Sequence, residues 1–290
     1  MVEADPRQGH SGRVICGLIG AGIQGSRSPA LHEGEAKAQG LELSYRLIDL
    51  DVLGAGTEAL PGLLADAVRN GFRGLNITFP CKQAIIPLLD GVSEEARSIG
   101  AVNTVVIAEG KLRGHNTDGP GWGWGFRRAL PDEDLTRVVL LGAGGAGSAC
   151  ADAVLRLGAR QLVIVDREAG RGDALAARMN SIHGARCIAV ADLAQALAGA
   201  SGLIHATPTG MAKLPGLPVP EGLLRPGLWV SEIVYVPLET ELLRSAKRAG
   251  CRIMDGGHMN VGQAVGGFRL FTGREADAAR MDAHFRSLDA

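Results

Sequence analysis

Aromatic residues are scarce in this chain of 290 residues, at 4% of the total, and neither sign of charge is in excess. The 30 Lys and Arg residues against 31 Asp and Glu residues leave a formal net charge of −1. A nucleic-acid protein or a binder of anionic membranes needs a basic surface, so this balance excludes both classes of partner. The contents of 46% hydrophobic and 21% charged residues are typical of folded chains and exclude a mainly disordered protein.

The sequence also lacks paired cysteines and long apolar runs. Its five cysteines are scattered, odd in number and never spaced as C-x-x-C, which argues against a disulfide framework and against a zinc site. No metal is therefore expected, and a reducing cytoplasm is the expected location. No stretch approaches the roughly 20 apolar residues that span a bilayer. The polar residues 1–12 carry no apolar core of a signal peptide and are expected to form a loose leader.

The abundant features are glycine, with 42 residues, and a regular alternation of short β-branched runs with Ala/Leu-rich stretches. In the first part of the chain the pattern predicts strands at 13–20, 43–50, 74–78 and 101–108, helices at 29–39 and 60–69, and several helical segments over 82–98. Such alternation is typical of an α/β fold with a mainly parallel sheet covered on both faces.

A polar break at 130–137 precedes a second series of strands and helices. Strands are expected at 138–141, 161–165, 187–190, 202–206, 228–234 and 251–254, and the last stretches, 261–272 and 276–288, are expected to be helical. The chain length also favours two domains over one. We therefore expect a substrate-binding domain at 13–117 and 257–290 and a dinucleotide-binding domain at 118–256.

A glycine-rich turn joins the strand at 138–141 to a helix and has the G-x-G-x-x-G form. Glycines at these three positions allow a tight turn, a close approach of backbone N–H groups to a pyrophosphate, and close packing of the strand on the helix. The motif therefore predicts a dinucleotide site, formed by Gly142, Ala143, Gly144, Gly145, Ala146 and Gly147.

Asp166 ends the next predicted strand, 19 positions after Gly147. A carboxylate there can accept hydrogen bonds from the ribose 2′-hydroxyl and repels a 2′-phosphate, so NAD is the expected cofactor. Arg167 complicates this choice, because its guanidinium could stack on adenine or bind a phosphate, and NADP use stays open.

Seven short motifs, in this order, resemble the shikimate/quinate dehydrogenase family over residues 14–273. The motifs are S-R-S-P-A-L-H from Ser26, N-I-T-F-P-C-K from Asn76, G-A-V-N-T from Gly100, G-H-N-T-D-G from Gly114, H-A-T-P-T-G-M from His205, E-I-V-Y-V-P-L-E-T from Glu232 and M-N-V-G-Q-A from Met259. The resemblance implies a substrate domain and a Rossmann-type domain with a cleft between them. It also implies reversible oxidation of a ring hydroxyl, with a carboxylated polyol as the expected small-molecule substrate. Whether the chain forms a homodimer stays an open question.

The same resemblance assigns roles to individual residues. Lys82 and Asp118 match the catalytic pair. The candidate ligands of the substrate carboxylate are Ser26, Ser28 and Tyr235, and those of its hydroxyls are Thr78, Asn103, Asp118 and Gln263. The candidates beside the nicotinamide are Thr207, Ile233, Gly256 and Met259. His32, on the first helix, is interpreted as a structural histidine.

The implied reaction needs these residue types. Oxidation of an alcohol moves a hydride to the nicotinamide and a proton to a titratable side chain that touches the hydroxyl. We assign proton transfer to Lys82 with Asp118 as its orienting partner, and the division of labour within this coupled pair stays open. Polar side chains around a polyhydroxy acid also reject analogues that lack a hydroxyl, because buried polar groups would be left unpaired.

Four positions depart from the usual family pattern. Cys81 stands where Tyr is usual, His205 where Asn is usual, Glu232 where Asp is usual, and Asn260 where Leu is usual. The leading hypothesis is an NAD-preferring shikimate or quinate dehydrogenase. A biosynthetic enzyme linked to NADP, a relative acting on an amino-substituted analogue such as aminoshikimate, and a silent nicotinamide-binding regulator are the alternatives.

Overall fold

The computed structural model describes residues 13–168 and 170–288, which form two compact units. Unit 1 contains the described residues up to Ser93, Val102–Thr117 and the residues from Ala264 onward, and unit 2 contains Glu94–Ala101 and Asp118–Gln263. The predicted leader, 1–12, lies outside the described residues. The predicted domains and these units divide alike between Thr117 and Asp118, whereas 94–101 and 257–263 group with unit 2.

Unit 1 is built on a six-stranded sheet with the order β2-β1-β3-β5-β6-β4. Its strands are β1 (Val14–Gly20), β2 (Leu43–Asp49), β3 (Gly74–Ile77), β4 (Gly91–Val92), β5 (Thr104–Ala108) and β6 (Lys111–His115). Its helices are α1 (Ser28–Ala38), α2 (Leu50–Leu53), η1 (Thr57–Ala59), α3 (Leu60–Arg69), α4 (Cys81–Ala84), η2 (Ile86–Leu88) and α12 (Ala278–Ser287).

The pairing of this sheet is mainly parallel, as predicted. β1 pairs in parallel with β2 and β3, and β4 pairs in parallel with β6. β5 runs antiparallel to both β3 and β6. The antiparallel pairing of β5 with β6 follows from a hairpin at Glu109 and Gly110, whose φ angles of 52° and 74° suit a two-residue turn.

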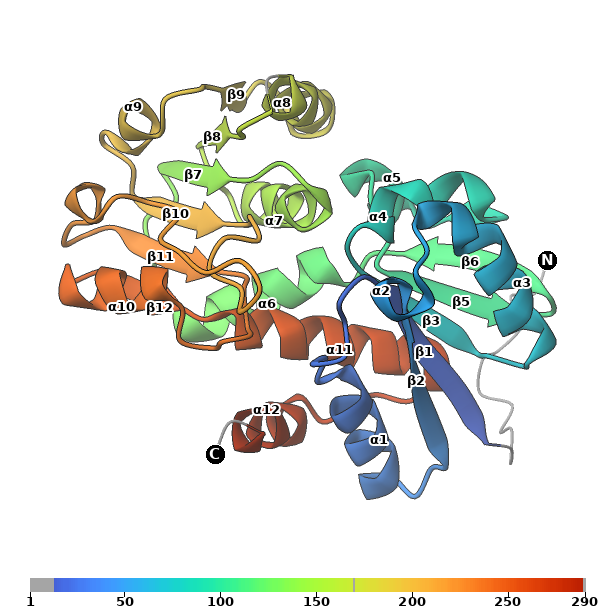
Figure 1. The fold of residues 1–290 in the computed structure, drawn as a ribbon. Helices are drawn as coiled ribbons and strands as arrows, with labels where there is room; N and C mark the ends of the chain where they lie inside the picture. The colour runs from blue at the N-terminus through green and yellow to red at the C-terminus, as the bar shows by residue number, and fades with distance from the viewer. Residues whose placement is uncertain (1–12, 169, 289–290) are drawn as a thin grey trace. The chain divides into compact units, whose positions relative to one another are not determined.

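Unit 2 is built on a six-stranded, fully parallel sheet with the order β12-β11-β10-β7-β8-β9 (Figure 1). Its strands are β7 (Arg137–Leu141), β8 (Gln161–Val165), β9 (Cys187–Ala189), β10 (Gly202–His205), β11 (Trp229–Glu232) and β12 (Arg252–Met254). Its helices are α5 (Glu94–Ile99), α6 (Asp118–Ala129), α7 (Gly145–Arg156), α8 (Arg171–His183), α9 (Leu193–Leu197), η3 (Glu221–Leu223) and α10 (Glu241–Arg248). The order is that of doubly wound dinucleotide-binding sheets.

Alternate residues of the unit 2 strands face two separate hydrophobic cores. Val138 and Leu162 belong to the core packed against α6, α7 and α8. Val139 and Val163, one residue further along, belong to the core packed against α9 and α10. Because successive strand residues point to opposite faces, continuous apolar strands are what a sheet covered on both faces requires.

Three aromatic residues form a cluster in the first of these cores. The Trp122 and Phe126 rings stack with centroids 5.0 Å apart, and Trp229 meets Phe126 edge-on at 4.9 Å. The indole N–H of Trp122 donates to Ser231 Oγ at 2.9 Å. Glycine allows α6 to pack closely here, because a Cβ on Gly121 would lie 2.4 Å from the backbone nitrogen of Gln263.

Helix α11 (Gly256–Thr272) contributes residues to both units, since the division falls between Gln263 and Ala264. In unit 1 its Phe271 joins the core with Cys16 and Tyr45. No helix within the described part of the chain is long and apolar enough to cross a bilayer. The same residues contain no group of three or more His, Cys, Asp or Glu side chains that could hold a metal ion.

Candidate active site

The carboxyl ends of β1 and β3 lie side by side in unit 1, and the predicted substrate residues follow them. The chain after β1 forms the serine loop, residues 21–28, and the chain after β3 leads through Thr78 to α4. Two backbone hydrogen bonds join these segments, from Ala21 N–H to Phe79 O at 2.9 Å and from Thr78 N–H to Ile19 O at 2.9 Å. Strand order reverses at β1, so this edge is where an open α/β sheet binds ligands.

Ser26 and Ser28 lie at the start of α1. Ser26 Oγ accepts the backbone N–H of Ser28 at 3.3 Å, and Ser28 is buried. Arg27 occupies the cap position of this helix without a capping side-chain hydrogen bond, and Pro29 lies in the first turn. Ser28 is therefore not the cap residue, whereas Ser26 binds the first backbone N–H of the helix.

Asp49, at the end of β2, holds the serine loop and was not among the predicted site residues. Its carboxylate accepts hydrogen bonds from Gly22 N–H at 2.8 Å, Ile23 N–H at 3.0 Å, Gln24 Nε2 at 3.0 Å and Asp51 N–H at 3.1 Å. Burial alone raises the pKa of Asp49, but these four donors outweigh it and hold the pKa below its ordinary value. Asp49 is thus an ionised buried anchor for the loop.

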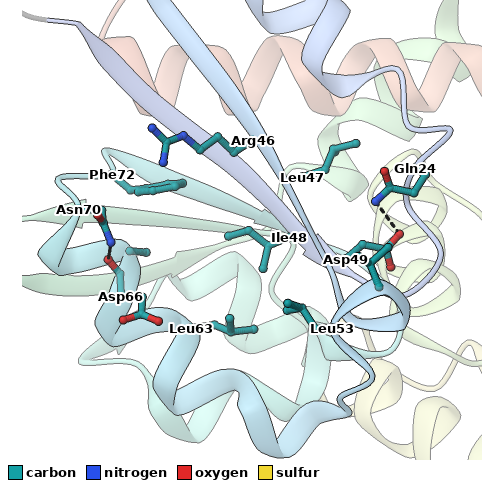
Figure 2. A pocket seen from close by; sticks show the side chains of 12 residues that line it. Gln24, Arg46, Leu47, Ile48, Asp49, Leu53, Leu63, Asp66, Asn70 and Phe72 are labelled. Carbon is teal, nitrogen blue, oxygen red and sulfur yellow. Dashed lines mark hydrogen bonds between the residues drawn. The ribbon is translucent and has the colours of Figure 1, made fainter.

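Figure 2 shows Asp49 and Gln24 at one side of a hollow of about 340 Å³ beside β2, α2 and α3. The remaining lining is mostly apolar and includes Leu47, Ile48, Leu53, Leu63 and Phe72. None of the predicted site residues lines this hollow. It is therefore distinct from the ligand-binding edge of the sheet, although the two share the Asp49 anchor.

Lys82 is half-buried in the short helix α4. Its backbone carbonyl accepts the N–H of Val102 at 2.8 Å, and the preceding turn closes from Cys81 N–H to Thr78 O at 2.8 Å. Lys82 and Thr78 therefore come from one tight turn after β3. A solvated helix lysine would be mostly exposed, and Lys82 is not.

Asn103 is buried just before β5, where its side chain holds the residue that precedes Asp118. Its carboxamide oxygen accepts the backbone N–H of Thr117 at 2.7 Å, and its Nδ2 donates to Thr117 Oγ1 at 2.9 Å. Asp118, 4% exposed, is the first residue of α6 and belongs to unit 2. Asn103 thus fixes the chain at the point where it enters Asp118.

His32 is structural in this geometry, as interpreted from the sequence. Its ring is completely buried and stacks on Tyr45 with centroids 4.9 Å apart. Burial lowers the pKa of His32 to about 3, so the ring is neutral at physiological pH.

The glycine loop joins β7 to α7 at the point in unit 2 where strand order reverses. Gly142 has φ of +103°, and a Cβ on Gly147 would lie 2.0 Å from the carbonyl oxygen of Gly142. Ala143 N–H donates to Asp166 Oδ2 at 2.8 Å. Only glycine fits both positions, and the loop leads into the amino end of a 12-residue helix, which suits a pyrophosphate.

Asp166 is half-buried at the end of β8, where Glu168 N–H also donates to its carboxylate, at 2.9 Å. Arg167 is exposed. Arg171, at the start of α8, forms an ion pair with Glu168 at 2.7 Å. An acidic acceptor and two arginines therefore lie on one turn beside the glycine loop.

A buried polar network connects the ends of β10 and β11. His205 Nδ1 lies 2.8 Å from Glu232 Oε1, and His205 Nε2 lies 2.5 Å from Thr207 Oγ1. Glu232 also accepts the backbone N–H groups of Ile233 at 2.8 Å and Val234 at 3.0 Å. Two of the sequence departures, at 205 and 232, thus contact two predicted nicotinamide residues, Thr207 and Ile233.

The other predicted residues of unit 2 lie at the start of α11 and after β11. A Cβ on Gly256 would lie 2.6 Å from the carbonyl oxygen of Ile233, so glycine lets the two segments approach. Met259 is buried, Tyr235 is half-buried, and Gln263 Nε2 donates to Asn260 O at 3.0 Å.

The two other sequence departures are both buried. Burial raises the pKa of the Cys81 thiol to about 11. The carboxamide oxygen of Asn260 has no hydrogen-bond partner among the described residues. Both departures from the family pattern therefore lie in the protein interior and not on its surface.

The sequence matches two family models: the shikimate dehydrogenase substrate binding domain at residues 18–105 and shikimate / quinate 5-dehydrogenase at 127–213. The shikimate dehydrogenase (NADP(+)) of Streptomyces avermitilis is 55% identical over 94% of this chain and 95% of its own. The quinate/shikimate dehydrogenase (NAD(+)) of Corynebacterium efficiens is 47% identical over 95% and 98%.

A solved structure agrees with these matches. Quinate dehydrogenase from Corynebacterium glutamicum in complex with NAD is similar with a TM-score of 0.87 and 44% identity, over 95% of this chain and 99% of that one. The family prediction made from seven motifs is thus confirmed, and the chain belongs to the shikimate/quinate dehydrogenase family.

Proposed function

We propose that this oxidoreductase reversibly converts a ring hydroxyl of shikimate or quinate to the ketone of the 3-dehydro acid, with NAD as the preferred hydride acceptor. The observation that carries the proposal is the glycine loop at the switch point of unit 2, hydrogen-bonded to the acidic end of β8. The relatives named for shikimate and quinate supply the substrate class.

Lys82 is the group that takes the hydroxyl proton, and Asp118 is its orienting partner. Both are withdrawn from bulk water, Asp118 almost completely, which strengthens their electrostatic interaction with a bound alcohol. In the reverse direction the ammonium group of Lys82 stabilises the developing alkoxide and returns the proton. Ser26, Ser28 and Tyr235 bind the carboxylate.

The hydroxyl groups of the ring are bound by Thr78, Asn103 and Gln263. Each of these side chains both donates and accepts hydrogen bonds, as a ring hydroxyl does. The Asn103 amide is already bonded to Thr117, so its position is fixed before substrate enters. This rigidity favours one orientation of the ring.

The residues of unit 2 fit a nicotinamide dinucleotide. The glycine loop and the start of α7 would hold the pyrophosphate, Asp166 and Arg167 the adenosine end, and Thr207, Ile233, Gly256 and Met259 the nicotinamide. When bound, the dinucleotide supplies the hydride acceptor. The fit rests on Gly147, where any side chain would collide with the loop backbone.

NAD is preferred because the Asp166 carboxylate, held by two backbone donors, lies where a 2′-phosphate would be repelled. A specific observation keeps NADP as the second candidate. Arg167 directly follows Asp166, Arg171 begins α8 nearby in sequence, and the relative from S. avermitilis is named for NADP(+). The two cofactors therefore have to be compared directly.

The deciding experiment is a matrix of initial rates with shikimate, quinate and aminoshikimate against NAD and NADP. We expect the highest kcat/KM with NAD and with one of the first two acids. Higher kcat/KM with NADP would instead identify the biosynthetic type. Binding of NAD without turnover of any substrate would favour a silent regulator.

An Asp166→Asn variant tests the cofactor assignment on one residue. Removal of the negative charge lowers the repulsion of a 2′-phosphate, so the ratio of kcat/KM for NADP to that for NAD is expected to rise about tenfold or more. Asp173→Asn, on the exposed side of α8, is the matched control. An unchanged ratio would mean that the ribose is read elsewhere.

Two broader expectations remain proposals. All five cysteines are free and buried, which suits the reducing cytoplasm proposed for the chain. A homodimer is the proposed assembly, and light scattering after size-exclusion chromatography measures it directly.

A further inference from the structure

His205 and Glu232 form a completely buried pair, and its hydrogen bonds leave few choices for the protons. Both side chains have no exposed surface. Glu232 Oε1 faces the backbone N–H groups of Ile233 and Val234 as well as His205 Nδ1, and Glu232 Oε2 accepts the Thr240 hydroxyl at 3.0 Å. All these neighbours can act as donors, so the carboxylate is an acceptor at every contact.

The proton of a neutral His205 ring therefore lies on Nδ1, which donates to Glu232. The second nitrogen, Nε2, is then an acceptor, and its partner is Thr207 Oγ1. The Thr207 hydroxyl must point its hydrogen at His205. Thr207 Oγ1 also accepts the backbone N–H of Thr209, at 3.3 Å.

A threonine hydroxyl has one hydrogen and two lone pairs. The hydrogen of Thr207 is directed at His205 and one lone pair at Thr209, so the group that remains for a ligand is a lone pair. Thr207 can then only accept a hydrogen bond from the cofactor. Its polarity is set by a histidine that does not itself reach the surface.

We propose that His205 is a positioning residue that makes Thr207 an acceptor for the carboxamide NH₂ group of the nicotinamide. The inference rests on the proposed nicotinamide site and deepens it, because it identifies the atom of the cofactor that Thr207 reads. An imidazolium at 205 predicts the reverse. It would donate to Thr207, whose hydrogen would then be turned toward the carboxamide oxygen.

A cofactor analogue separates the two arrangements. In 3-acetylpyridine adenine dinucleotide a methyl group replaces the carboxamide NH₂, while the carbonyl oxygen is retained. Calorimetric titration measures both dissociation constants without turnover. The quantity to compare is the dissociation constant of the analogue divided by that of NAD. In the native protein we expect the ratio to exceed that of Thr207→Val by roughly fivefold, the effect of one lost hydrogen bond.

Variants then assign the effect to the pair. Thr207→Ser keeps the hydroxyl and should keep the native ratio. His205→Phe keeps a ring but removes the acceptor nitrogen, so its ratio should approach that of Thr207→Val. Ser231→Ala is the control, because it removes an equally buried hydrogen bond, with Trp122, from the neighbouring position of β11 and should leave the ratio unchanged.

The outcomes are distinct. Equal ratios in the native protein and in Thr207→Val, with NAD still bound, overturn the inference and leave the proposed function intact. Failure of both dinucleotides to bind overturns the cofactor site and this inference with it. If His205→Phe does not fold, the comparison of Thr207→Val with Thr207→Ser still decides whether the hydroxyl accepts.

Discussion

Lys82 is the residue to which we assign proton transfer, from its motif and its partly buried position in α4. Truncation to alanine removes the proton acceptor but leaves unit 2 untouched. We expect Lys82→Ala to lower kcat by about 10²- to 10⁴-fold with little change in NAD affinity. Steady-state rates and calorimetric titration measure the two quantities.

Lys111→Ala is the matched control for this variant, since Lys111 is an exposed lysine of the same unit paired with Asp90. Its kcat should equal that of the native protein. A Lys82→Ala variant with native kcat would remove Lys82 from the chemistry.

Asp49 acts on substrate binding through the serine loop. In Asp49→Asn one carboxylate oxygen becomes an NH₂ group that faces backbone donors instead of accepting from them. Displacement of the loop should raise KM for the acid substrate by about tenfold while KM for NAD stays unchanged. Asp90→Asn also loses a backbone contact, to Leu112, and is the control. Equal changes in both KM values would indicate general destabilisation instead.

At the scale of elements, α12 is tied to α1 through one buried carboxylate. Arg280 Nε and Nη2 donate to the two oxygens of Glu35, each at 2.7 Å, and Asp277 N–H donates at 2.9 Å. Burial raises the pKa of Glu35, but hydrogen bonds from Arg280, Asp277 and Gln39 outweigh it and lower the pKa below its ordinary value.

This link predicts a loss of stability in acid. Because the pKa of Glu35 is lower in the folded state, its ionised form stabilises the fold above the unfolded pKa, near 4.3, and that contribution disappears as pH falls through the folded pKa. Glu35→Gln should lower the melting temperature by several degrees at pH 7, and the difference should shrink below pH 4. Glu33→Gln, two residues away in the same helix at an exposed position, is the comparison variant.

The elements themselves were largely predictable, because buried parallel strands and amphipathic helices have distinct periods. α3 and β8 have the predicted bounds. The helical segments predicted over 82–98 are present as α4, η2 and α5, but the strand β4 between η2 and α5 was not predicted. β6 was not predicted, since its one apolar residue, Leu112, gives no clear alternation.

The candidate site was predictable only where one motif contains the residue. Asp49 was not predicted as a site residue because its partners in the serine loop lie 25 to 27 residues away in sequence. Thr240 lies in the same motif as Glu232, but the motif gave it no role, and its hydrogen bond to the Glu232 carboxylate was found only in the structure. His205 and Glu232 drew attention as substitutions, but their contact with each other follows from the pairing of β10 with β11.

For the whole molecule, separate cores in the two units predict separate unfolding. The aromatic cluster around Trp122 belongs to unit 2, and the core around Tyr45 belongs to unit 1. We expect two calorimetric transitions. NAD at 100 times its dissociation constant stabilises the folded unit that binds it by about 2.7 kcal/mol. The midpoint temperature of the unit 2 transition should therefore rise by about 5–10 °C, while that of unit 1 stays unchanged. A single transition that moves as one would show that the units unfold together.

The buried thiol next to Lys82 has a practical consequence. Cys81 is inaccessible, and its pKa of about 11 keeps it protonated, so a maleimide reagent can react with it only after α4 opens. The rate of alkylation of Cys81 therefore measures local opening of α4 beside Lys82. A bound acid substrate that stabilises α4 should lower this rate, so substrate binding could be followed without any change in the absorbance of the cofactor.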